Sequence, residues 1–428
     1  MSSAILPRRA LVDTPAQASA WAGFRYGALG FPLAFLSLPL YILLPSHYAA
    51  QYGVPLTTLG LVLLGTRALD AALDPFIGQF VDRVFARSPS HALWAAAIAA
   101  IVVSAGFTAL FFPQVGANAL LVWLAGALVL TYVAFSVLSV IHQAWGTRLG
   151  GDPKQRARVV AWREGCGLVG VLAASTLPLQ LGTGAASMVL AAALVIGVAL
   201  LAGAPSAPSR PRDSAAHWTL PWHGAPFRRL LAVFMLNGIA SAVPATLILF
   251  FVRDRLQADH AQALFLGAYF TGAVLSIPLW VRAVRRFGLV HAWLFGMGLA
   301  VVAFAWALTL GAGDIAAFVA VCVASGVAMG ADLTIPGALL TGVVQRAGHA
   351  TFAEGVYAGW WNSVTKLNLA LAAGTALPLL ALAGYAPGQR SAQAMLALSV
   401  AYVGVPCCLK LMAAALLWQG SRKTGGQE

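Results

Sequence analysis

Residues 65–83 read GTRALDAALDPFIGQFVDR, a segment in which an arginine and two aspartates interrupt a long apolar run. The whole chain is strongly apolar, since 60% of its 428 residues are hydrophobic and only 9% are charged. Such a composition is typical of a membrane protein rather than of a water-soluble globule. The segment therefore places Arg67, Asp70 and Asp74 where lipid would be the expected surroundings.

Apolar runs long enough to cross a bilayer recur along the chain. A membrane-spanning helix needs about 20 mostly apolar residues. The runs are continuous and do not alternate, so they favour helices over the strands of a membrane barrel. The expected spans are 27–49, 56–81, 93–113, 118–143, 160–181, 185–203, 228–252, 261–282, 288–310, 314–340, 355–383 and 391–418. The sequence thus predicts an all-α membrane protein with twelve transmembrane helices.

The distribution of basic residues indicates how these helices are oriented. Almost all lysines and arginines outside the spans fall on one side of the expected membrane, and Arg253, Arg255 and Arg390 fall on the other. Positive loops stay in the cytoplasm, so we expect both termini to be cytoplasmic in a bacterial-type inner (plasma) membrane. The formal net charge of +13 is then a topology signal, with binding to anionic membrane lipids as a side effect. We expect no nucleic-acid partner.

A polar stretch divides the spans into two sets of six. Residues 204–227, APSAPSRPRDSAAHWTLPWHGAPF, are rich in proline, serine and arginine, which predicts a cytoplasmic linker. It separates an N-terminal six-helix bundle, residues 1–203, from a C-terminal six-helix bundle, residues 228–428. A weak internal repeat aligns DPFIGQFVDR (74–83) with IPLWVRAVRR (277–286). Under this alignment, positions 67, 70 and 74 correspond to Phe270, Ala273 and Ile277, so the fold itself does not require charges there.

Charged side chains inside the spans are the main candidates for function. Arg67, Asp70 and Asp74 share one helical face, and each charge at membrane depth costs about 2.5–3.5 kcal/mol on insertion scales. Lys366 is the other charge that lies clearly inside an expected span. The two carboxylates can bind a coupling cation, either a proton or sodium. The alternative is a salt-bridged network that only locks two helices together; we favour the cation site because intramembrane ionisable residues are usually functional.

Four stretches resemble known transporters. GQFVDR (78–83) resembles the loop motif of the major facilitator superfamily. RALDAALDP (67–75), GGDPKQRARVVAWREG (150–165) and FAEGVYAGWWNSVTKLNLALAAG (352–374) resemble the glycoside–pentoside–hexuronide:cation symporter (melibiose permease-like) family. The resemblance implies two six-helix pseudo-repeats that rock by alternating access, a small, sugar-like substrate, a proton or sodium as coupling ion, and a monomer.

The resemblance also assigns roles to residues. It implies that Asp70 and Asp74 bind the cation and that Arg67 and Lys366 are their charge partners. This chain departs from the family at Leu73, where the family has a coordinating asparagine, and it lacks the sugar-binding acids of the first and fourth helices. The loss of an oxygen ligand favours a proton over sodium. The missing sugar acids leave a lysophospholipid or other amphiphile as the alternative substrate.

Further residues are candidates for the substrate cavity and for gating. The candidates for the cavity are His142, Trp145, Tyr357, Trp361 and Asn362. The candidates for ion pairs that close the cytoplasmic side are Asp82, Arg83, Arg156 and Arg163. Exposed pairs contribute only about 0–1 kcal/mol each, but a small bias can decide between two conformations. Packing and topology are the competing interpretations of these residues.

Enzyme chemistry has no support in the sequence. No H-E-x-x-H, C-x-x-C, G-x-S-x-G or phosphate-loop motif occurs. The four cysteines all fall inside apolar runs, where they act as small hydrophobic residues. We therefore expect a transporter with no enzymatic activity, no cofactor and no metal beyond a sodium ion at Asp70 and Asp74. A membrane scaffold or sensor that does not transport is a third, less favoured class.

Overall fold

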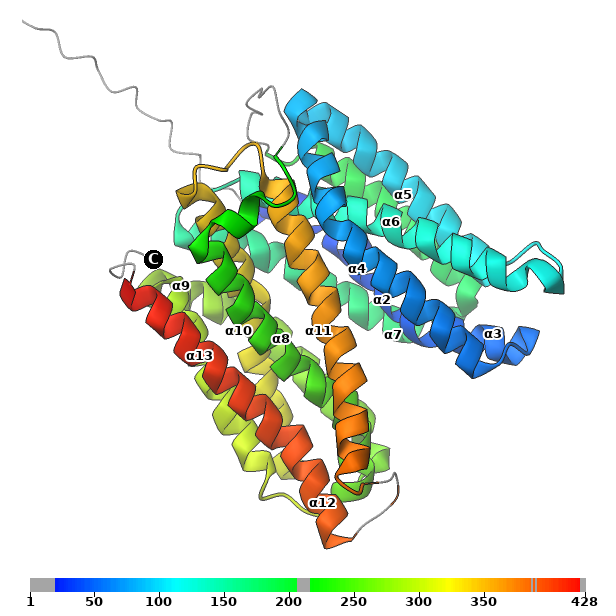
Figure 1. Ribbon diagram of the computed structural model, residues 1–428, viewed down its shortest axis with the longest axis vertical. Coiled ribbons are helices and arrows are strands. Elements are labelled where there is room, and N and C mark those ends of the chain that lie inside the picture. The colour runs from blue at the N-terminus through cyan, green and yellow to red at the C-terminus, as the bar shows by residue number, and fades with distance from the viewer. Residues whose placement is uncertain (1–19, 206–215, 386–387, 389–390, 424–428) are drawn as a thin grey trace, which may run out of the picture.

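The protein is a bundle of long helices (Figure 1). The computed structural model describes residues 20–205, 216–385, 388 and 391–423. Helices α1 to α7 form the first half, with bounds Ala20–Gly27, Gly30–Leu38, Leu44–Tyr52, Leu56–Arg87, Pro89–Phe111, Leu120–Arg148 and Pro153–Ala202. Helices α8 to α13 follow, with bounds Ala225–Phe250, Gln262–Ala307, Ile315–Arg346, Glu354–Leu382, Ala392–Ser399 and Val405–Lys423. Short π and 3-10 turns link some of them, at Pro39–Leu43, Ala117–Ala119, Leu220–His223, Phe251–Arg255, Asp259–Ala261 and Val400–Gly404.

Two of the helices each contain a reversal of the chain at a glycine. Gly182 in α7 has φ 82° and ψ 167°, and Gly288 in α9 has φ 78° and ψ 171°. Only glycine adopts this backbone without steric cost. Each helix therefore supplies two spans, and the described helices account for the twelve that the sequence predicts. Seven helices in the described part are long and apolar enough to cross a membrane by length and composition alone.

The two halves of the chain lie side by side, and α11 of the second half packs against α4 of the first (Figure 1). Within the linker, residues 206–215 lie outside the described part. The C-terminal part of the linker packs against α11, because the backbone oxygen of Trp218 accepts a 2.8 Å hydrogen bond from Trp360 Nε1. The boundaries at 203 and 228 remain our proposal for where the two bundles end and begin.

Glycines allow α4 and α11 to approach each other closely. A methyl group on Gly78 would overlap the carbonyl oxygen of Gly355, and one on Gly359 would overlap that of Asp74. Small residues are the usual means of close helix packing in membranes. A second contact between the halves joins α7 to α9, where Ala161 and Leu168 pack with Ala273 and Ile277.

The glycine contact leads to a stability prediction. Gly78→Ala should lower the free energy of unfolding by about 1–3 kcal/mol, the usual cost of overpacking. Gly60→Ala is the matched control, because it lies in the same helix with nothing within 4 Å of the added carbon. Thermal unfolding of both purified variants checks this. A Gly78→Ala protein as stable as Gly60→Ala would show that the two helices are not in tight contact.

Candidate cation-binding site

Asp70 and Asp74 project from the same face of α4 because they are one helical turn apart. Lys366, near the middle of α11, reaches both. Its Nζ lies 2.7 Å from Asp70 Oδ2, 2.8 Å from Asp74 Oδ2 and 2.9 Å from Asp74 Oδ1. Three of the charged residues that were singled out from the sequence therefore meet across the contact between the two halves.

Ser136 on α6 completes the cluster. Its hydroxyl donates to Asp70 Oδ1 at 2.8 Å and accepts from Lys366 Nζ at 2.8 Å. The sequence analysis missed this residue. A signal was available, because Ser136, Ser139 and Gln143 follow a helical three- and four-residue spacing within an otherwise apolar span. We call Asp70, Asp74, Ser136 and Lys366 the carboxylate cluster.

The residues of the carboxylate cluster are largely buried, which raises the energetic cost of any charge that is not compensated. Asp74 is fully buried, Asp70 is 5% exposed, and the Lys366 side chain is 21% exposed. Two ionised carboxylates face one ammonium group, so these groups carry one net negative charge, which the guanidinium of the neighbouring Arg67 offsets only in part. An unpaired charge away from water is costly. A proton or a small cation at the carboxylates would neutralise it.

Arg67 lies one turn before Asp70 but is directed at a different neighbour. Its guanidinium carbon lies 5.7 Å from the centre of the Tyr132 ring on α6. This is a cation–π distance. Arg67 thus lies beside the carboxylate cluster and against the ring of Tyr132.

Of the predicted cavity residues, Asn362 lies nearest to the polar face of α6. Its Nδ2 donates to Ser139 Oγ at 3.3 Å, and its Oδ1 accepts from Gln143 Nε2. Ser363, the next residue, donates to the Ala71 carbonyl oxygen at 2.8 Å. These contacts extend the polar interface between α11 and the first half.

The other predicted cavity residues are engaged in packing. His142 Nε2 lies 2.8 Å from the Tyr26 carbonyl oxygen, and the two rings are 4.6 Å apart. Trp145 is 2% exposed and donates to the Pro205 carbonyl oxygen. Both residues are therefore buried in the first half, so we do not retain them as cavity residues.

The aromatic residues of α11 are packed as well. The ring of Tyr357 meets Phe227 edge-on at 4.9 Å, and its hydroxyl lies 2.9 Å from His349 Nδ1. Trp361 stacks on Phe234 with a centroid distance of 3.7 Å. Trp361 also borders a space of only about 20 Å³ between the halves, which is too small for a solute.

At the linker end of the molecule, the start of α11 is fastened to the first half. Asp82 is fully buried and accepts hydrogen bonds from the backbone nitrogens of Gly355 at 2.7 Å and Val356 at 2.9 Å. A carboxylate at a helix N-terminus satisfies free N–H groups and opposes the helix dipole. Arg148 on α6 forms a 3.0 Å ion pair with Glu354, the first residue of α11, and both side chains are buried. We call these five residues the α11 clamp.

The predicted gating residues thus differ in what they contact. Asp82 belongs to the α11 clamp, but the adjacent Arg83 is exposed. Arg163 pairs at 2.6 Å with its neighbour Glu164 on the same helix. Arg156 is buried beside Gly342 on α10, across the interface from its own helix α7. The sequence analysis did not pair Arg148 with Glu354, because the two are far apart in the chain.

The α11 clamp allows a direct comparison of neighbouring residues. Hydrogen bonds to charged groups contribute about 1.5–3 kcal/mol each, so Asp82→Ala should lower the free energy of unfolding by at least about 2 kcal/mol. Arg83→Ala should change it by no more than about 0.5 kcal/mol, because the side chain is exposed. Spin-label distances across the linker end should lengthen only in Asp82→Ala. Equal behaviour of the two variants would contradict a clamp at Asp82.

Comparison with known proteins identifies the family. Residues 23–419 match the family described as MFS/sugar transport protein. The chain belongs to this family. Membership makes the protein an integral membrane transporter of the major facilitator superfamily, which comprises transporters and not enzymes, and it confirms the predicted fold class.

Among curated relatives, two proteins of Escherichia coli K12 are similar. YagG, which is named as a candidate glycoside/cation symporter, is 27% identical over 159 residues, 36% of this chain and 34% of YagG. The inner membrane symporter YicJ is 27% identical over 145 residues, 33% of this chain and 30% of YicJ. The chain thus aligns with about a third of the length of each relative.

Solved structures show the same fold over nearly the whole chain. A bacterial homologue of the iron transporter ferroportin, in an outward-facing state, superposes with a TM-score of 0.70 at 16% identity, covering 94% of this chain and 99% of that one. The E. coli fucose:proton symporter FucP superposes with a TM-score of 0.66 at 14% identity, covering 92% and 98%. At these identities the likeness extends to the fold alone.

Proposed function

We propose that this protein is a cation-coupled secondary transporter that moves a sugar or glycoside by alternating access, with a proton or sodium bound at Asp70 and Asp74. The observation that carries the proposal is the position of Lys366. It is supplied by α11 of the second half and is held by both carboxylates of α4 in the first half. A cation that binds the carboxylates competes with the ammonium group of Lys366, so cation binding and the contact between the halves are linked.

Competition at the carboxylate cluster provides the coupling step. With the site empty, Lys366 joins α11 to α4. A bound cation neutralises Asp70 and Asp74 and releases Lys366, which weakens this joint while the α11 clamp still holds the linker end. Because a ligand shifts a two-state equilibrium only by its differential affinity, the cation can favour whichever arrangement separates Lys366 from the carboxylates.

A purely structural lock is the competing interpretation, and the second interface argues against it. The contact between α7 and α9 is the counterpart of the α4–α11 contact, and it is built from Ala161, Leu168, Ala273 and Ile277. Apolar packing thus suffices to join the halves there. Buried ion pairs are weak contributors to stability compared with apolar residues of similar volume, so the charged groups in the middle of the α4–α11 contact are better explained by function.

The nature of the cation follows from the available ligands. Sodium prefers several oxygen ligands, and the carboxylate cluster offers two carboxylates and the Ser136 hydroxyl, while Leu73 supplies none. We favour a proton. Sodium is the alternative, and uptake assays with and without sodium at fixed pH distinguish the two.

For the substrate, the descriptions of the family and of YagG favour a sugar or glycoside. An amphiphile is the second candidate substrate. The first expected membrane span, which includes α2, has no acidic residue in its stretch GFPLAF (30–35). Reconstituted vesicles screened side by side with sugars, glycosides and lysophospholipids test both. Sugar-driven ion movement supports the first candidate, lysophospholipid-driven movement the second, and no response to any solute would favour a non-transporting scaffold.

Orientation in the membrane follows from charge. Arg83 and Arg148 lie at the end of the molecule that the α11 clamp closes. Positive residues are retained in the cytoplasm. We therefore place this end and both termini in the cytoplasm of a bacterial-type inner membrane, with the protein acting as a monomer.

A further inference from the structure

A second buried ion pair lies in the second half of the chain, away from the carboxylate cluster. Lys410 Nζ on α13 lies 2.7 Å from Asp332 Oδ2 on α10 and 2.7 Å from Asn237 Oδ1 on α8. Trp293 Nε1 donates to Asp332 Oδ1 at 2.8 Å. The sequence analysis named only Lys366 as a clearly intramembrane charge beyond α4, so this pair corrects it. The pair is neutral as a whole and both oxygens of Asp332 are engaged, so it gives a charged ligand no counter-charge.

The ion pair borders a cavity of about 270 Å³. Every residue that lines this cavity falls between 240 and 410. The cavity therefore lies inside the second half, and it shares no residue with the carboxylate cluster. A cavity of about 150 Å³ with apolar walls holds one benzene molecule. The larger volume here has room for one substituted ring.

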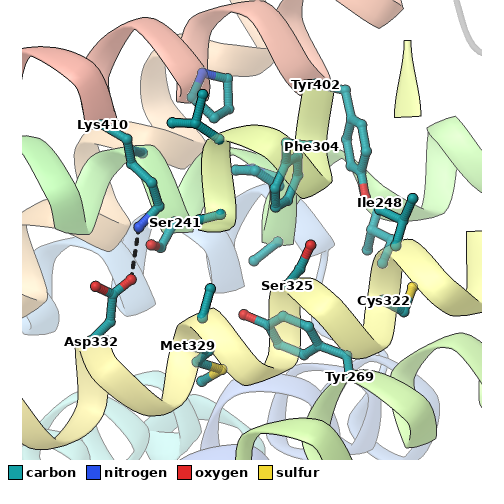
Figure 2. A pocket seen from close by; sticks show the side chains of 18 of the residues that line it. Ser241, Ile248, Tyr269, Phe304, Cys322, Ser325, Met329, Asp332, Tyr402 and Lys410 are labelled. Atoms are coloured by element: carbon teal, nitrogen blue, oxygen red, sulfur yellow. Dashed lines mark hydrogen bonds and ion pairs between the residues drawn. The ribbon is translucent and has the colours of Figure 1, made fainter. Parts of the chain in front are cut away.

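Aromatic and aliphatic side chains form most of the cavity wall (Figure 2). The rings of Phe304 and Tyr402 lie together, with their centres 5.8 Å apart, and Ile248 lies close to Tyr402. Phe318 also lines the cavity. Aromatic side chains pack favourably against another ring in offset or edge-on arrangements, and a charge placed among them without a partner is costly. The wall thus favours a neutral ligand with an aromatic body.

One polar side chain in the wall has unused hydrogen-bonding capacity. The Ser325 hydroxyl is buried, with 6% of the residue exposed, and among the described residues it has no hydrogen-bond partner. Figure 2 shows it beside Tyr269 of α9, and α9 and α10 touch at this level, because a methyl group on Gly326 would overlap the Tyr269 carbonyl oxygen. An unpaired buried polar group costs about 1–3 kcal/mol. Since a hydroxyl group both donates and accepts, one hydroxyl group on a ligand would satisfy Ser325.

A ligand that matches this cavity has one ring, one hydroxyl group and no charge. We propose that the cavity binds a small neutral phenol, with its hydroxyl group at Ser325 and its ring against Phe304 and Tyr402. A sugar fits less well, because its several hydroxyl groups would meet apolar walls without partners. The site goes beyond the proposed transport function, which rests on the carboxylate cluster.

The route of entry is indicated by exposure. Ser241 and Ala245 on α8 and Leu266 on α9 line the cavity and are themselves exposed, whereas Ser325 is buried. The mouth thus lies between α8 and α9, and the hydroxyl site lies deeper. A bulky side chain in place of Ala245 should close this mouth, and Ala232, an exposed alanine of α8 that does not line the cavity, provides the matched control.

The test measures binding of radiolabelled 4-ethylphenol to the purified full chain in lipid nanodiscs, with empty nanodiscs subtracted. We expect saturable binding of one molecule per chain, competed by unlabelled 4-ethylphenol and not by the charged analogue 4-ethylbenzoate. Ser325→Ala should weaken binding of 4-ethylphenol about tenfold, the equivalent of one hydrogen bond of about 1.4 kcal/mol. Binding of ethylbenzene, which has the same ring and no hydroxyl group, should be unchanged in this variant.

Further variants test the mouth and separate this site from the transport site. Ala245→Trp should abolish binding of 4-ethylphenol, and Ala232→Trp should leave it unchanged. Asp74→Asn should bind 4-ethylphenol like the unaltered protein, because Asp74 is outside the cavity; loss of transport in that variant thus leaves this proposal standing.

Four results would overturn the proposal. They are no saturable binding above empty nanodiscs, equal competition by 4-ethylbenzoate, an equal response of 4-ethylphenol and ethylbenzene to Ser325→Ala, and undiminished binding in Ala245→Trp. Size-exclusion profiles verify that each variant is folded, and Ser325→Ala alone decides if Ala245→Trp is not.

Discussion

Asp74→Asn is expected to lower cation-driven accumulation of the transported solute by about 5–150-fold, the range that corresponds to a coupling free energy of 1–3 kcal/mol. Asparagine has nearly the same shape as aspartate but cannot bind a proton or carry the charge that attracts a cation. Asp74 is fully buried and contacts Lys366 through both carboxylate oxygens. Initial rates of uptake into proteoliposomes under an imposed cation gradient measure this effect.

The control for this variant is another aspartate. Asp259→Asn removes an exposed carboxylate in the 3-10 turn Asp259–Ala261 that precedes α9 and should leave accumulation within about twofold, since surface substitutions away from a site usually change stability by less than about 0.5 kcal/mol. Exchange of labelled for unlabelled solute, without a cation gradient, should survive in Asp74→Asn. Accumulation that is equal in Asp74→Asn and the unaltered protein would exclude Asp74 from the cation site.

Lys366→Met is expected to have the largest effect on stability. Removing one partner of a buried ion pair typically costs about 3–5 kcal/mol, because the remaining charge is left without compensation. The Lys366 side chain is 21% exposed, so water screens part of this cost and we expect about 3 kcal/mol. Thermal unfolding of the purified protein should therefore shift to a clearly lower temperature.

A second variant shows whether the loss of stability in Lys366→Met comes from uncompensated charge or from lost packing. The triple variant Asp70→Asn/Asp74→Asn/Lys366→Met carries no charge in the carboxylate cluster and should recover most of the lost stability, while cation-driven accumulation stays absent. Recovery of both stability and accumulation would support the structural lock instead. No loss of stability in Lys366→Met alone would show that the two carboxylates are accommodated without the lysine.

The helices were predictable because their signal is local. Continuous apolar runs specify membrane helices; Gly182 falls between two expected spans, and Gly288 is the first residue of the expected span 288–310. Asp70 and Asp74 were predictable as a pair from their one-turn spacing. Their meeting with Lys366 came from the resemblance to a family, since the sequence of a single chain carries no distance between α4 and α11.

The residues that were missed owe their roles to tertiary contacts. Ser136 is one of two serines in a mostly apolar helix, and the packing of α6 against α4 and α11 brings it to Asp70. Asp332 and Lys410 also meet only through folding, from helices 78 positions apart in the chain. Conversely, Trp145 was a candidate for solute binding because aromatic side chains occur both in packed cores and in binding sites. Its side chain is buried, which indicates a role in packing.

The central claim is that Asp70 and Asp74 bind the cation that drives transport. Its most direct test is solute-evoked ion movement, followed with an internal pH dye in proteoliposomes at zero and at high sodium. We predict that a transported solute evokes a pH change through the unaltered protein at zero sodium; solute uptake that occurs only at high sodium identifies sodium as the coupling ion instead. We predict neither response in Asp70→Asn/Asp74→Asn, in which solute exchange persists. Undiminished ion movement in that double variant would contradict the account.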